Sequence, residues 1–124
     1  MRLMAIVLTA ALLWPVSVFS KTPDQFVNGN DLFRDCSDQH DSAQGYCQGY
    51  VVGLLDAFMA VNALKATGLA IPSACPPKED LTPNQVRDIV LQWLTAHPAT
   101  RHNAATHEAL AALLAAFPCK EQAH

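Results

Sequence analysis

The chain has 124 residues, a length that fits one domain at roughly 150 residues per domain. Eight Lys and Arg residues against 11 Asp and Glu residues give a formal charge of −3, with five His residues neutral. This balance excludes nucleic acid as a default partner, because no basic excess is present to displace counterions from phosphates. With 51% hydrophobic and 15% charged residues, the chain is not a disordered acidic tail and can build a core.

The start of the chain has the pattern of a secretory signal peptide. A positive charge at Arg2 precedes an apolar run that continues to Trp14, and Ser20 places a small residue at the expected cleavage position. The run is shorter than the roughly 20 apolar residues that span a bilayer, which argues against a membrane anchor. We therefore expect residues 1–20 to be cleaved and residues 21–124 to form a single exported helical domain.

Two helices are predicted in the first half of the exported part. A turn and cap signal at residues 28–30 starts a short helix that ends near Cys36. After a polar loop at residues 37–41, a long helix is predicted from Ser42 to Thr67, closed by Gly68. Its polar side chains share one narrow stripe, so the helix needs apolar cover on more than one side. The apolar residues of this helix include Tyr46, Tyr50, Val51, Leu54, Leu55, Phe58, Val61 and Leu64.

The third helix has the clearest start signal in the sequence. Thr82 as N-cap, Pro83 at the first helical position and Gln85 three residues after the cap form a capping box. Leu81 and Val86 are spaced as a hydrophobic staple across this start. The expected buried face repeats at helical spacing and comprises Val86, Ile89, Val90, Trp93 and Leu94.

The fourth helix follows a proline-containing break. The third helix is expected to stop before Pro98, because a residue that precedes proline is pushed away from helical geometry. The last helix then runs from about Asn103 to Phe117 and is ended by Pro118. It is expected to bury Leu110, Leu113, Leu114 and Phe117. The four elements together predict an all-α fold, a small four-helix bundle.

All four cysteines lie in the exported part, where an even count predicts two disulfides. If successive helices run antiparallel, Cys36 and Cys47 lie at one end of the long helix, and Cys75 and Cys119 lie at the other. Only the pairs Cys36–Cys47 and Cys75–Cys119 then bring Cα atoms within about 7 Å, since other pairings would span a helix of roughly 30 Å. No Cys-x-x-Cys knuckle is present to indicate a zinc site.

The sequence contains no recognisable catalytic constellation. His107 and Glu108 begin like a zinc-protease helix, but Ala111 stands where the second His ligand would be. His97, His102 and His107 are five residues apart, a spacing that does not keep them on one helix face. No Gly-x-Ser-x-Gly elbow surrounds a serine. We therefore expect no metal, no cofactor and no enzymatic activity.

Two features of the long helix suggest a packing role. Gly49 and Gly53 lie four residues apart, at a cost of roughly 1 kcal/mol each relative to alanine. Small residues at this spacing let another helix approach closely, either inside the monomer or from a second copy. Asp56 lies roughly 80° off the polar stripe, so it is either a hydrogen-bonded, partly buried carboxylate or it faces a partner. With Tyr50, these three residues are the candidates for helix packing or dimerisation.

Several segments match one family pattern when they are taken in order: Gly29–Leu32, Cys36, Gly45–Ala57, Cys75-Pro76, Leu81-Thr82, Gln85, His97-Pro98, His102 and Ala116–Cys119. They resemble the Rap/Tai family of type VI secretion amidase immunity proteins of Gram-negative bacteria. The resemblance implies an exported, helical, disulfide-bonded protein of the periplasm that is often a homodimer. It further implies that the chain binds a peptidoglycan amidase effector and blocks its active-site groove, so that the producing cell is spared.

The resemblance places specificity in two loops. The first is the 37–41 loop, and the second is the loop from His97 to Asn103, which we expect to insert into the partner's groove. The candidate partner-binding residues of this second loop are His97, Pro98, Thr100, Arg101 and His102. Two other functions remain open: a periplasmic acid-stress chaperone and a structural subunit of an envelope complex. A chaperone would dissociate and bind clients near about pH 2–3, as its carboxylates become protonated.

Overall fold

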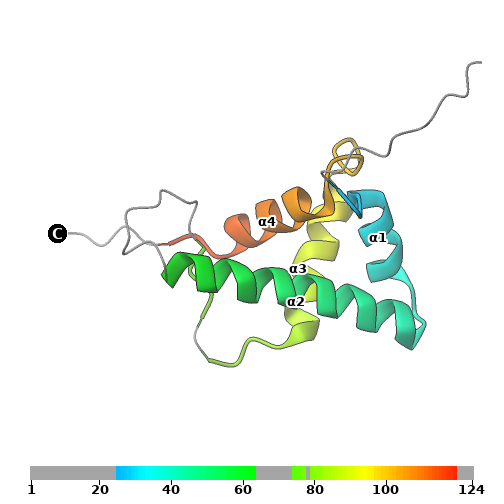
Figure 1. Ribbon diagram of the computed structural model, residues 1–124. Helices are drawn as coiled ribbons and strands as arrows, with labels where there is room; N and C mark the ends of the chain where they lie inside the picture. Colours follow the sequence, from blue (N-terminus) through cyan, green and yellow to red (C-terminus); the bar gives the residue numbers. More distant parts are fainter. Residues whose placement is uncertain (1–24, 64–73, 78, 120–124) are drawn as a thin grey trace, which may run out of the picture.

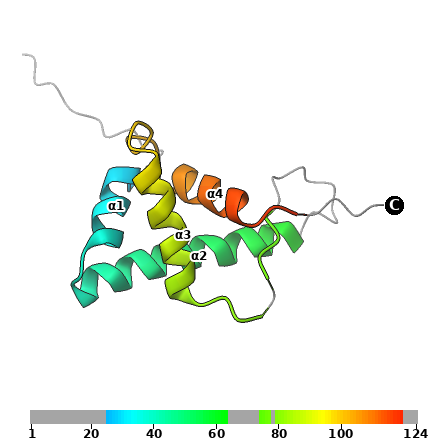
Figure 2. The same ribbon diagram turned by 180° about the vertical axis from the view of Figure 1, so that it is seen from behind.

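The computed structural model describes residues 25–63, 74–77 and 79–119, which contain four α-helices and no strand beyond two isolated bridges. The longest helix lies across the molecule, and the other three pack against one side of it (Figures 1 and 2). The predicted all-α bundle is therefore confirmed. The helices are α1 (Gly29–Ser37), α2 (Asp41–Ala63), α3 (Pro83–Ala96) and α4 (Ala105–Ala116).

The start of α1 follows from a local capping box. The Asn28 side chain accepts hydrogen bonds from the backbone N–H groups of Asn30 and Asp31, at 2.9 and 3.0 Å. The Asp31 carboxylate in turn accepts from the N–H of Asn28 at 3.4 Å. These bonds satisfy donors that the first turn of a helix leaves free. Leu32 and Cys36 turn into the core from this short helix.

α2 begins one residue before its predicted start, at Asp41. Its predicted last residues, 64–67, and the Gly68 cap lie outside the described residues, as does the expected signal peptide at residues 1–20. The buried arc of α2 consists of Cys47, Val51, Leu55 and Phe58. Two residues of the predicted polar stripe are half-buried and bond to α3: Gln48 donates to Asn84, and Gln44 accepts from Arg87.

α3 begins as the sequence predicts. The Thr82 hydroxyl accepts from the N–H of Gln85 at 3.3 Å, and the Gln85 side chain accepts from the N–H of Thr82 at 2.7 Å. Pro83 occupies the first helical position, and the helix ends at Ala96, before Pro98. Of the expected buried face, three residues are buried and two are partly buried against the core: Val86, Val90 and Leu94, then Ile89 and Trp93.

The predicted buried face of α4 is wrong except for Leu113. The buried residues are Ala105, Glu108, Ala109, Ala112 and Leu113, whereas Leu110, Leu114 and Phe117 are only partly buried. The prediction favoured large apolar side chains. In the structure the alanines face inward. Small side chains at a helix contact allow a short distance between the helix axes. An alanine face lets α4 lie close to its neighbours.

The two disulfides are Cys36–Cys47 and Cys75–Cys119, with Cα atoms 5.1 and 4.9 Å apart. These are the pairs that the helix order predicts. The predicted antiparallel path is only partly followed, because α3 crosses α2 steeply instead of running beside it (Figure 1). The fourth helix still leads back to the C-terminal end of α2, so the second pair of cysteines meets there (Figures 1 and 2).

Candidate functional site

The loop between α3 and α4, residues 97–104, is hydrogen-bonded to the start of α1. The N–H of Gly29 donates to the Asn103 carbonyl, and the N–H of Asn30 donates to the Arg101 carbonyl, both at 2.9 Å. A Cβ on Gly29 would stand 2.7 Å from the Arg101 carbonyl oxygen. Glycine is therefore required for this close approach, and the resemblance-matched Gly29 fixes the loop against α1.

A buried carboxylate of α4 accepts hydrogen bonds from residues of the loop. Glu108 of α4 is only 5% exposed. Its carboxylate accepts from the Trp93 indole N–H at 3.1 Å, the Thr100 hydroxyl at 3.0 Å and the Asn103 amide at 3.2 Å. A buried charge with three donors is well satisfied, so this network holds the loop in one conformation. Sequence reasoning missed this role, although a glutamate among the alanines of α4 was a signal of a buried partner.

The Arg101 side chain points into the fold. Its Nε donates to the carbonyl of Leu94 at 2.5 Å, and its guanidinium lies 3.6 Å from the ring centroid of Phe33. The carbonyls at the end of α3 have no partner inside the helix, and the Arg101 side chain supplies one. Arg101 is therefore a structural tie between α1 and α3.

Of the other candidate residues of this loop, His97 packs against α3, whereas Pro98 and His102 are exposed. His97 stacks on Trp93 with ring centroids 3.9 Å apart, and its Nδ1 lies 2.8 Å from the Trp93 carbonyl. Pro98 and His102 are exposed at the tip of the loop, where the His102 ring bonds back to the Ala99 carbonyl. The structure thus brings all five candidates together on one loop, in which the tip presents Pro98 and His102.

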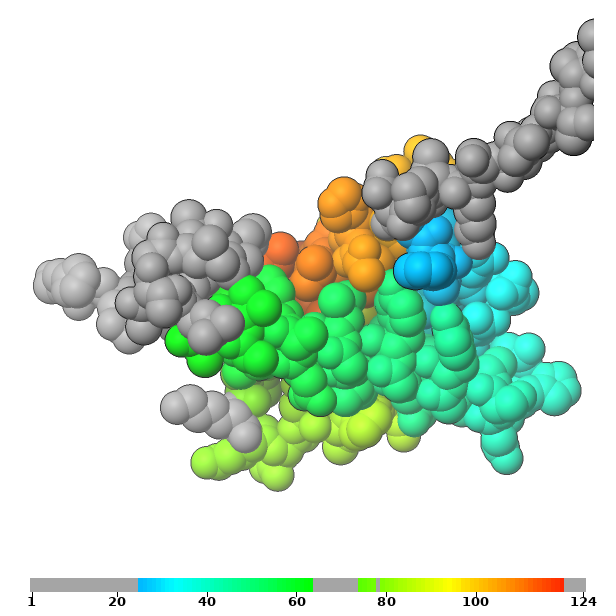
Figure 3. Space-filling model, in the orientation of Figure 1, coloured from blue at the N-terminus to red at the C-terminus, as the bar shows by residue number. Residues whose placement is uncertain are grey.

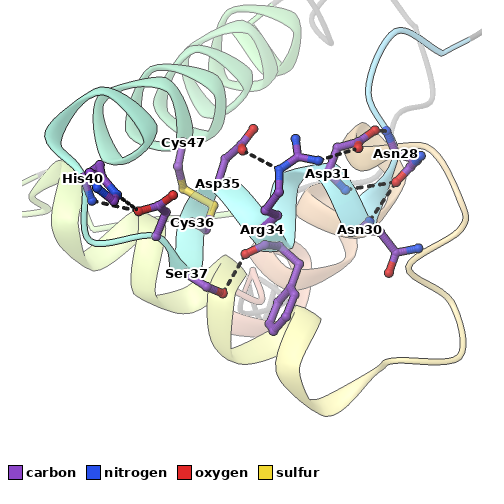
Figure 4. A network of polar contacts seen from close by, with 11 residues as sticks. Asn28, Asn30, Asp31, Arg34, Asp35, Cys36, Ser37, His40 and Cys47 are labelled. Carbon is purple, nitrogen blue, oxygen red and sulfur yellow. Dashed lines mark hydrogen bonds and ion pairs between the residues drawn. A yellow bond between two sulfur atoms is a disulfide. The ribbon is translucent and has the colours of Figure 1, made fainter.

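The 37–41 loop joins α1 to α2 beside the Cys36–Cys47 disulfide (Figure 4). Asp38 accepts from both the backbone N–H and the ring of His40. These hydrogen bonds lower the pKa of Asp38, mainly through the backbone N–H, and Asp38 raises the pKa of His40. Both groups are exposed, so this short turn presents a charged pair at the opposite end of α1 from the 97–104 loop.

The outer face of α2 is open. A Cβ at Gly49 or Gly53 would meet no atom within 4 Å, so packing inside the monomer does not explain these glycines over the described part of the chain. Asp56 is exposed and makes no hydrogen bond or ion pair with a described residue, which rules out the buried alternative. Tyr50 lies to the side of this face, next to Tyr46, and burial raises its pKa. α2 crosses the front of the molecule in Figure 3.

Within the residues that the structure describes, no group of three or more His, Cys, Asp or Glu side chains could hold a metal ion. The cysteines of both disulfides have no free thiol. None of the described helices has the length and apolar composition needed to cross a bilayer. The 97–104 loop, the 37–41 loop and the outer face of α2 are three surface features of the described residues that could contact another protein.

A family model of Rap1a immunity proteins matches residues 28–119. The chain belongs to the Rap1a immunity protein family. The match extends from the N-cap of α1 to the last cysteine and confirms the resemblance seen in the sequence. Comparisons with curated proteins and with solved structures found no match.

Membership of this family gives the class of the protein. An immunity family implies a protein that binds and inhibits a cognate secreted effector. The two disulfides fit an oxidising compartment. The match also covers the 97–104 loop and the residues that bond to it.

Proposed function

We propose that this Rap1a-family protein acts in the periplasm, where it binds and inhibits a peptidoglycan amidase delivered by type VI secretion. In this function the chain protects the cell that produces the toxin. The 97–104 loop enters the active-site groove of the amidase, and Pro98 and His102 at its tip make the contacts. No catalytic group is required of the inhibitor.

The observation that carries the proposal is the preformed shape of the loop. Backbone bonds to α1, the Glu108 carboxylate and the Arg101 side chain fix it at three places. A loop that is already ordered loses little conformational entropy on binding, and this is how a rigid inhibitor gains affinity. The family match supports the same conclusion, because it spans the loop and every residue that holds it.

The test uses the oxidised, mature protein and a peptidoglycan amidase encoded by any toxin-like gene adjacent to its own, with hydrolysis of purified peptidoglycan as the readout. Stoichiometric inhibition near neutral pH is expected. His102→Glu should weaken inhibition at least about tenfold, because it places a new charge at the contact. Gln92→Glu on the exposed side of α3 is the matched control and should leave inhibition unchanged.

Two other results would each change the proposal. An amidase that stays fully active with the wild-type protein would refute the immunity function, and suppression of client aggregation in acid would then favour the chaperone. If His102→Glu inhibits the amidase as well as the wild type does, the immunity function stands, but the 97–104 loop is not part of the interface. The two failures are distinguishable because the first concerns the wild type and the second concerns only the variant.

We also propose that the protein is a homodimer that packs through the outer face of α2. This face consists of small, exposed residues at helical spacing: Gly45, Gly49, Gly53, Ala57 and Ala60. Tyr46 and Met59 beside it are 47% and 41% exposed, which is unusual for large apolar side chains. Light scattering should give twice the monomer mass, and Gly53→Arg should give the monomer. A monomeric wild type at all concentrations would overturn the dimer.

A further inference from the structure

The two disulfides differ in their access to solvent. Cys36 and Cys47 are 3% and 0% exposed, and both belong to the hydrophobic core. Cys75, in contrast, is exposed, and Cys119 is half-buried. Thiol–disulfide exchange begins when a thiolate reaches one of the two sulfur atoms, so its rate depends on access to them. In the folded protein, Cys75–Cys119 is therefore the disulfide that an external thiol can reach.

This disulfide lies away from both proposed interfaces. It joins the 74–77 segment to the chain that follows α4, near the C-terminal end of α2 (Figures 1 and 2). The Asn62 amide of α2 donates to the carbonyl of Ala74, and Asn62 lies about 180° around α2 from Gly53, at about 100° per residue. α4, with 12 residues and a length of about 18 Å, separates the disulfide from the 97–104 loop. Access to Cys75 is therefore compatible with the proposed dimer and with a partner on the loop.

The Cys75–Cys119 disulfide closes a loop of the chain that contains α3, the 97–104 loop and α4. Its two cysteines are 44 residues apart, and a cross-link of this span stabilises the fold by restricting the unfolded chain. Two backbone contacts lie at the same point of the described chain: Ala74 pairs with Pro118, and the N–H of Cys75 donates to the Phe117 carbonyl at 2.8 Å. These contacts keep the two cysteines adjacent when the S–S bond is broken, so the thiols can form it again.

We propose that Cys75–Cys119 is a reversible exchange site for an external dithiol, which reduces this disulfide in the folded protein and leaves Cys36–Cys47 intact. One thiolate of the dithiol attacks the Sγ of Cys75, the S–S bond breaks, and Cys119 leaves as a thiolate. The second thiol of the reductant then attacks the reductant's own sulfur in the mixed disulfide and releases Cys75. Two electrons and two protons pass from the dithiol, which becomes a disulfide, to the two cysteines, which become thiols.

The position of Cys119 determines the class of reductant. Its Cα lies 4.9 Å from that of Cys75, and the backbone contacts of Ala74 and Cys75 keep it there. A monothiol that attacked Cys75 would leave the Cys119 thiolate beside the mixed disulfide, where it forms the original bond again. A dithiol completes the reduction, because its second thiol reacts within the same molecule. The redox state of this site then controls the covalent closure of the part of the chain that carries the 97–104 loop, a property that goes beyond the proposed function and needs no effector to be tested.

The probe is dithiothreitol, added in excess to the oxidised, mature protein at neutral pH. Samples are quenched with N-ethylmaleimide at timed intervals, and the labelled cysteines are located by peptide mass spectrometry. We expect Cys75 and Cys119 to be labelled at least about tenfold faster than Cys36 and Cys47, because only the first pair is accessible in the folded protein. The buried disulfide of the same molecule is the matched control, so the comparison depends on no variant.

Two further arms test the route and the class of reductant. Urea at 1 M should leave the labelling rate of Cys75 nearly unchanged, whereas reduction through global unfolding would accelerate at least about fivefold. Glutathione, a monothiol, should add first to Cys75 and, at equal thiol concentration, give less than about a tenth of the reduced Cys75–Cys119 pair that dithiothreitol gives. Equal labelling rates of the two pairs, acceleration by urea, a first adduct on Cys119 or equal yields with the two reductants would each overturn the proposal.

Discussion

Replacement of Gly49 and Gly53 by alanine should stabilise the monomer. Both glycines lie in the middle of α2 and are exposed, and apart from the adjacent backbone of α2 no atom lies within 4 Å of the position that a Cβ would take. Alanine therefore brings no clash and recovers the helix propensity that glycine lacks, about 1 kcal/mol at each position. The double variant should gain about 2 kcal/mol in the free energy of unfolding, which raises Tm by roughly 10 °C for a domain of this size.

Gly29→Ala is the control, and it should lower the free energy of unfolding instead of raising it. A Cβ there would stand 2.7 Å from the Arg101 carbonyl oxygen and 2.9 Å from the Arg101 Cα. Because both atoms belong to the backbone, the loop must move and the hydrogen bond from Asn30 to Arg101 is strained. Overpacking of this kind costs about 1–3 kcal/mol, so this variant should be less stable than the wild type.

The assay is urea unfolding followed by circular dichroism, at a protein concentration low enough to keep the chain monomeric. A loss of stability in Gly49→Ala or Gly53→Ala under these conditions would refute the reasoning, because it would mean that something packs against α2 in the monomer. Repetition at high concentration tests the dimer as well. If the outer face of α2 is the interface, the added methyl groups separate the two helices and the gain in stability becomes smaller.

Three further predictions concern the groups that hold the loops. Glu108→Ala should cost about 3 kcal/mol of unfolding free energy, because three donors lose a buried acceptor, whereas Glu108→Gln, which keeps one acceptor oxygen, should cost about 1 kcal/mol in the same urea titration. NMR titration should place the pKa of His40 above 6.5 and that of Asp38 below 3.8, and Asp38→Asn should abolish the His40 shift. The contribution of the pair to stability is lost as pH rises through the raised His40 value or falls through the lowered Asp38 value, so it is largest in mildly acidic solution. The double variant Cys75→Ala/Cys119→Ala should lose about 4 kcal/mol, from the loop entropy of a bridge across 44 residues; an unchanged midpoint of unfolding would contradict this account.

The sequence predicted those features of the fold that depend on neighbouring residues. The capping boxes at Asn28 and Thr82 and the stop before Pro98 form from side chains and backbone groups a few residues apart, so their geometry is almost independent of the rest of the chain. The disulfide pairs also followed from the helix order, because a helix is stiff enough to keep the cysteines at its two ends apart. The family pattern was carried by the same short segments.

The tertiary structure decided which side of each helix is buried and what the polar residues do. α4 carries apolar residues around much of its circumference, so periodicity could not choose between its leucines and its alanines, and close packing chose the alanines. The role of Glu108 depends on donors that come from α3 and from the loop, and Arg101 became an internal tie only because Phe33 and the end of α3 lie beside it. Such contacts join residues far apart in the chain, and no local pattern encodes them. The sequence alone determined the helices, their ends and their cross-links, whereas only the packing of those helices decided which loop residues are left to meet a partner.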